Sequence, residues 1–107
     1  MRRFHIAIAV AEISRSVDDY TRRLGCAPSV VVPGEYALWR TPGLNLSIRR
    51  TSDQTGTLRH LGWEDPSARE FATERDVNGI LWENFSAEQQ AREILEAWPH
   101  ADYPLQP

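Results

Sequence analysis

Phe4-His5-Ile6-Ala7-Ile8-Ala9-Val10, close to the N-terminus, is the segment that most clearly predicts a strand. Successive side chains of a β-strand point to opposite faces of its sheet. One face of this strand would carry only large apolar residues, whereas the other would carry His5, Ala7 and Ala9. We therefore expect the apolar face to pack beneath a helix and the face that holds His5 to line an open site.

The rest of the first fifty residues predicts one helix and three more strands. The helix is predicted over 13–24, because apolar residues recur at helical spacing and Gly25 stands where a C-terminal glycine stop belongs. Two Pro-Gly pairs act as turn signals between the strands. The predicted strands are 29–32, 35–40 and 44–50.

The second half begins after a polar linker, residues 51–57. Asp65 and Pro66 have the residue types of a helix N-cap and first position, which predicts a short helix that ends near Arg75. Ser86 and Gln89 have the spacing of a capping box. The elements predicted here are strand 58–64, helix 66–75, strand 80–85 and helix 87–98, followed by the tail 99–107.

Composition limits the class of protein. A chain of 107 residues is long enough for one domain. The net charge of −3 does not favour nucleic-acid binding, and no apolar run is long enough to cross a bilayer. The apolar stretch after Met1 is too short and polar for a signal peptide, so we expect a cytoplasmic protein. The single Cys26 excludes an internal disulfide.

Three segments, taken in order, resemble one known superfamily. The first is the strand with His5, followed by a helix that carries Ser16, Val17 and Tyr20 and ends in Leu24-Gly25. The second is Leu58-Arg59-His60-Leu61, and the third is Asp76-Val77-Asn78-Gly79-Ile80-Leu81-Trp82-Glu83. Together they resemble the vicinal oxygen chelate superfamily, which includes glyoxalases, extradiol dioxygenases and bleomycin-resistance proteins.

The resemblance implies an α+β fold in a single glyoxalase-like domain spanning 1–107. Residues 1–50 would form a βαβββ module, and 58–98 a shortened β-α-β-α second module. The sheet would be curved and mixed, with its helices on one side. The second module is shorter than in the family, and an unfinished sheet edge favours a homodimer.

The same resemblance implies a metal centre. His5, His60 and Glu83 match the positions of metal ligands, and two imidazoles with one carboxylate suit Fe(II), Mn, Zn or Ni. Asn45 stands where metal lyases of the family often have a glutamate or glutamine ligand. On the face predicted to hold the site, Asn45, Ser47 and Arg49 would contact a substrate, and Glu64 would transfer protons.

Three functions are consistent with these residues. The first is a metal-dependent lyase or dioxygenase that acts on a small molecule without an organic cofactor. The second is a metal-free small-molecule binding protein of the resistance type, which the short second half and Asn45 favour. The third is a reduced module that serves as a dimeric interaction domain.

Overall fold

Seven strands and two helices make up the computed structural model, which describes residues 1–103. The strands form one mixed, open sheet, so the expected α+β class is confirmed. In chain order the elements are β1 (Arg3–Val10), α1 (Ile13–Leu24), β2 (Val30–Val32), β3 (Tyr36–Arg40), β4 (Leu44–Arg50), β5 (Leu58–Glu64), β6 (Ala72–Arg75), β7 (Leu81–Phe85) and α2 (Ala87–Ala97).

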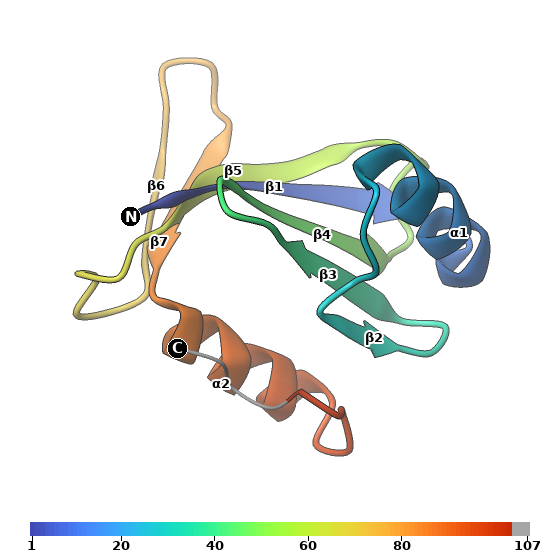
Figure 1. The fold of residues 1–107 in the computed structure, drawn as a ribbon. Coiled ribbons are helices and arrows are strands. Elements are labelled where there is room, and N and C mark those ends of the chain that lie inside the picture. Colours follow the sequence, from blue (N-terminus) through green and yellow to red (C-terminus); the bar gives the residue numbers. More distant parts are fainter. Residues whose placement is uncertain (104–107) are drawn as a thin grey trace.

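The sheet has the strand order β2-β3-β4-β1-β5-β7-β6, with β1 at its centre. On one side β1 pairs in parallel with β4, which pairs antiparallel with β3. On the other side β5 pairs in parallel with β7, which pairs antiparallel with β6. β1 and β5 join the two halves antiparallel. The same pairing pattern therefore occurs twice, and in Figure 1 the β6–β7 hairpin runs across the direction of β1 and β4.

Helix α1 packs on the apolar face of β1, as the alternation predicts. The buried cluster beneath it includes Val10, Ile13, Trp39 and Ile48, with Ile8 packed against its edge. The helix ends at Gly25, which adopts the left-handed conformation with φ of 75°. Both boundaries of the predicted helix are confirmed.

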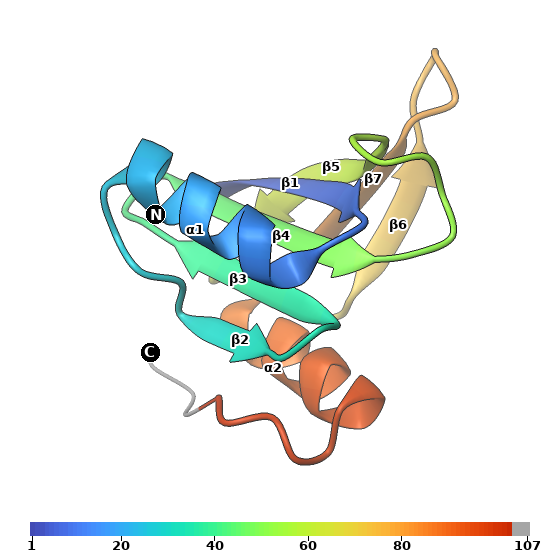
Figure 2. The ribbon, with the colours of Figure 1, turned by 90° about the vertical axis from the view of Figure 1, so that its right-hand side faces the viewer.

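Helix α2 packs on the opposite face, so the expectation of helices on one side is wrong (Figure 2). Its Ala91 and Ile94 lie against Tyr36 and Leu38. These two β3 residues lie on the same face as His5, because β3 is in register with β4 and β4 with β1. The capping box of Ser86 and Gln89 that begins α2 is confirmed. The site therefore lies between the sheet and a helix.

The predicted helix 66–75 is wrong, because this segment forms a turn and the edge strand β6. Asp65 does accept a hydrogen bond from the Ser67 backbone N–H at 2.9 Å, but only a turn follows. Residues 66–75 contain a single large apolar side chain, Phe71, which stacks on Phe85 with centroids 5.3 Å apart. A helix here would have no apolar stripe to bury.

The segment that follows α2, up to residue 103, packs on the same face of the sheet as α2. Tyr103 is buried in the cluster that contains Tyr36 and Ile94. The remainder of the predicted tail, 104–107, lies outside the described residues. Within residues 1–103, neither helix has the length and apolarity needed to cross a bilayer.

Candidate metal centre

Three residues lie side by side across the sheet where the site forms. The register of β1, β5 and β7 aligns His5 with Gly62, and Gly62 with Glu83. Gly62 has no side chain, and a Cβ at this position would collide with the backbone of Glu83. Because of this glycine, the His5 and Glu83 side chains approach each other across the strand between them.

His60 completes the group from the neighbouring position on β5, opposite Ala7. Its Nε2 lies 3.0 Å from Glu83 Oε1, and His5 Nε2 lies 3.9 Å from the same oxygen. The two imidazole rings have centroids 4.9 Å apart. The structure thus brings together all three residues predicted as metal ligands, and each comes from a different strand.

His5 is held in the tautomer that a metal ligand needs. Asn45 Nδ2 donates to the Glu64 carboxylate at 2.8 Å, which turns Asn45 Oδ1 toward His5. His5 Nδ1 therefore donates to Asn45 Oδ1 at 2.8 Å, and Nε2 keeps a free lone pair. That Nε2 is buried and has no hydrogen-bond partner. Burial lowers the pKa of His5 against the opposing effect of the Asn45 hydrogen bond, so the ring is neutral near pH 7.

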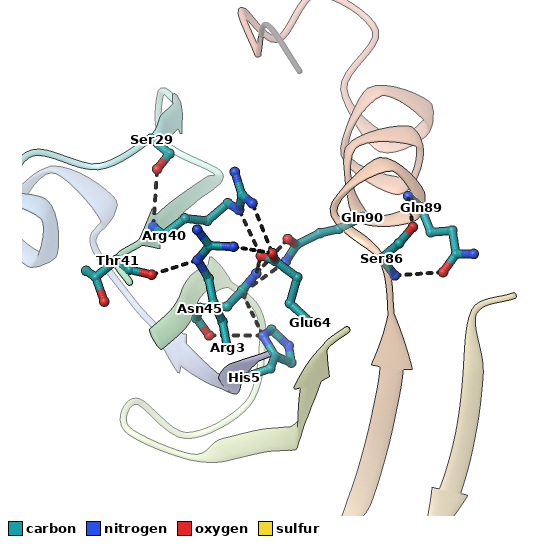
Figure 3. Close-up of polar contacts among 10 residues, drawn as sticks. All are labelled: Arg3, His5, Ser29, Arg40, Thr41, Asn45, Glu64, Ser86, Gln89 and Gln90. Atoms are coloured by element: carbon teal, nitrogen blue, oxygen red, sulfur yellow. Dashed lines mark hydrogen bonds and ion pairs between the residues drawn. The ribbon is translucent and has the colours of Figure 1, made fainter. Parts of the chain in front are cut away.

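Behind Asn45 lies a connected polar network (Figure 3). Gln90 of α2 exchanges two hydrogen bonds with the Asn45 amide, at 2.8 and 3.1 Å. Glu64 accepts from Arg3 at 2.7 Å and from two nitrogens of Arg40 at 2.8 and 2.9 Å. Hydrogen bonds of this kind orient a ligating histidine in metalloproteins. Asn45 is fully buried and does not line the cavity beside His5, so its expected contact with a substrate stays a prediction.

Glu64 has an environment unlike that of a proton-transfer group. Its burial would raise the pKa, but hydrogen bonds from Arg40 and Asn45 and the charges of Arg40 and Arg3 outweigh burial. The pKa falls to about 2, so Glu64 is ionised near pH 7. Its oxygens are occupied by three partners, which argues against the predicted catalytic role.

The donor set fits a divalent transition metal. The three donor atoms lie within 4.8 Å of one another. Two ligands bound about 2.1 Å from a tetrahedral ion are about 3.4 Å apart. The distances from Glu83 to the two imidazoles, 3.0 and 3.9 Å, bracket that value, so small side-chain rotations would place all three donors on one ion. Three protein ligands would leave coordination positions open.

His5, His60 and Glu83 are called the triad below. A cavity of about 130 Å³ opens between the triad and α2. Pockets for drug-sized ligands typically have volumes of about 300–1,000 Å³, so this smaller cavity suits a smaller molecule. Phe71 and Phe85 form an apolar wall of this cavity. Ser47 and Arg49 also line it, on the face where the alternation placed them. The other lining residues are Tyr36, Arg59, Gln90, Glu93, Ile94, Ala97 and Trp98.

Two charged lining residues, Arg59 and Glu93, are not among the site residues predicted from the sequence. Arg59 should face away from His60, but β5 has an irregularity here: Ala7 pairs with His60 and Ile8 with Leu58. A bulge of this kind re-aims a side chain, and Arg59 lines the cavity. Glu93 lies at the exposed mouth on α2, where burial and the charge of Glu83 raise its pKa. Its spacing of three from Gln90 is the signal that both face the sheet.

Comparison of the chain with protein-family models and with curated proteins found no match. Membership of the vicinal oxygen chelate superfamily therefore remains an expectation from the sequence motifs. The geometry of the triad is independent of that expectation.

Proposed function

We propose that the protein binds one divalent metal ion through His5, His60 and Glu83 and acts as a metal-dependent enzyme on a small molecule. The observation that carries the proposal is the buried His5 Nε2, which has no hydrogen-bond partner and faces Glu83. A buried polar atom without a partner costs about 1–3 kcal/mol. A metal ion would supply the missing partner and would neutralise Glu83.

The resemblance to glyoxalases and extradiol dioxygenases suggests the class of reaction. A metal held in this way acts as a Lewis acid on an oxygen atom of a bound substrate. Burial keeps His5 neutral, its hydrogen bond with Asn45 fixes the orientation of the ring, and Phe71 and Phe85 give one side of the cavity an apolar lining. Glu93 is the proposed proton-transfer group, because it is the carboxylate lining this cavity that is not a proposed metal ligand.

A metal-free binding protein is the second candidate. The apolar wall formed by Phe71, Phe85 and Ile94 favours it, because such a wall would hold an apolar ligand without a metal. Retention of a metal ion separates the two candidates.

The test is metal retention after loading the purified protein with Zn(II), Mn(II), Ni(II) or, without oxygen, Fe(II), followed by dialysis. We expect one ion per chain in the wild type and a loss of retention in His60→Ala and Glu83→Gln. The matched controls are His100→Ala and Glu96→Gln, which change exposed residues far from the triad in the sequence. Absence of retained metal, or equal retention in the triad variants, would overturn the proposal.

A further inference from the structure

Two arginines line the cavity beside the triad. Arg49 lies on β4 two residues after Ser47, on the face that carries His5, and its register partner on β1 is the small Ala9. Arg59 reaches the same cavity through the bulge in β5. Two strands that are not neighbours in the sheet thus bring two guanidinium groups to one wall.

Neither arginine has an acidic partner within residues 1–103. By contrast Arg50, next to Arg49 in the sequence, contacts Glu35 at 3.2 Å on the exposed side. Arg49 instead lies over the Trp98 ring at 4.9 Å. Both Arg49 and Arg59 are half-buried and form no side-chain hydrogen bond in this part of the chain.

The two positive charges affect each other. Both arginines line one cavity, where their positive charges repel each other. Like charges on a half-buried wall destabilise the folded protein unless an anion lies between them. Arginine is well suited to that anion, because its planar fork forms paired hydrogen bonds with carboxylates and phosphates.

We propose that Arg49 and Arg59 bind an oxyanion of the substrate, a carboxylate or phosphate group, while an oxygen of the same molecule faces the metal. The inference deepens the proposed function and rests on it for the second contact. The anion contact itself belongs to the arginines and is measurable without metal. The substrate class is therefore a small molecule with a negatively charged oxygen group near a metal-binding oxygen.

The test is calorimetric titration of the full chain, with and without Zn(II), using three probes of similar size. Malonate carries two carboxylates, phosphonoacetate replaces one by a phosphonate, and monomethyl malonate lacks one charge. We expect the wild type to bind monomethyl malonate about ten-fold or more weakly than it binds the tighter of the two dianions. The comparison of malonate with phosphonoacetate shows whether the site prefers a carboxylate or a phosphate-like group. A charge-assisted hydrogen bond supports a difference of this size.

The variants Arg49→Gln, Arg59→Gln and their double variant should weaken dianion binding about ten-fold or more and leave metal retention unchanged. Arg50→Gln is the matched control and should bind like the wild type. Dianion binding that is unaffected in the double variant, or equally weakened by Arg50→Gln, would overturn the oxyanion site. If no metal is retained but the arginine variants still abolish preference for the dianions, the oxyanion site stands and the metal centre fails.

Discussion

Asn45 controls the orientation of His5, because it contacts the imidazole on one side and Glu64 and Gln90 on the other. We predict that Asn45→Ala weakens metal binding about 10–100-fold, the usual effect of removing such a partner. Competition with a chromophoric chelator measures this change on the folded variant. Asn84→Ala, on the opposite face of β7 from Glu83, is the control. Unchanged affinity in Asn45→Ala would show that His5 needs no such support.

Glu64 should control stability in acid. Its folded-state pKa of about 2 lies below the ordinary value of 4.5, so its contribution is present above pH 4.5 and is lost as the pH falls towards 2. The shift corresponds to about 3 kcal/mol of unfolding free energy. Urea unfolding at several pH values between 7 and 3 should show a shallower loss of stability for Glu64→Gln than for the wild type. Parallel pH profiles would contradict this role.

At the scale of single residues, the sequence predicts the triad but not its surroundings. Alternation places His5, His60 and Glu83 on faces that can meet, and the structure brings them together. Alternation fails for Arg59, because a bulge depends on the pairing of two strands and leaves no local signal. The role of Glu64 was missed for a related reason: its partners Arg3 and Arg40 are distant in sequence.

At the scale of elements, the close approach of β5 and β7 depends on Gly62. We predict that Gly62→Ala separates these strands, destabilises the fold by more than about 1 kcal/mol and abolishes metal retention. Gly43→Ala is the control, because a Cβ there meets no atom within 4 Å and the backbone needs no positive φ. Chemical unfolding and metal analysis measure both effects. Equal stability of the two variants would contradict the close approach.

The elements also show where local signals are insufficient. Helix α1, with its periodic apolar stripe and its glycine stop, matches its predicted bounds. In contrast, Asp65 and Pro66 predict a helix start where only a turn forms, because a cap stabilises a helix only when an apolar face is buried behind it. Strand β6 is exposed along its length and forms through pairing with β7, which its own residues do not reveal.

At the scale of the whole molecule, one chain supplies all three candidate ligands. Metal content per chain should therefore be the same whether the protein is a monomer or the expected homodimer. Because the ion would bind only the folded chain, saturating Zn(II) at 100 times its dissociation constant should add about 2.7 kcal/mol of stability. We predict a rise in melting temperature of several degrees for the wild type and none for Glu83→Gln. An equal rise in both would place the ion elsewhere.

The most direct test of the metal centre is crystallography of the metal-loaded protein with data collected at the absorption edge of the ion. The structure predicts one anomalous peak per chain, bonded to His5 Nε2, His60 Nε2 and a carboxylate oxygen of Glu83, with His5 Nδ1 still hydrogen-bonded to Asn45. A peak bound by other residues, or no peak in a fully loaded crystal, would contradict the proposed metal centre.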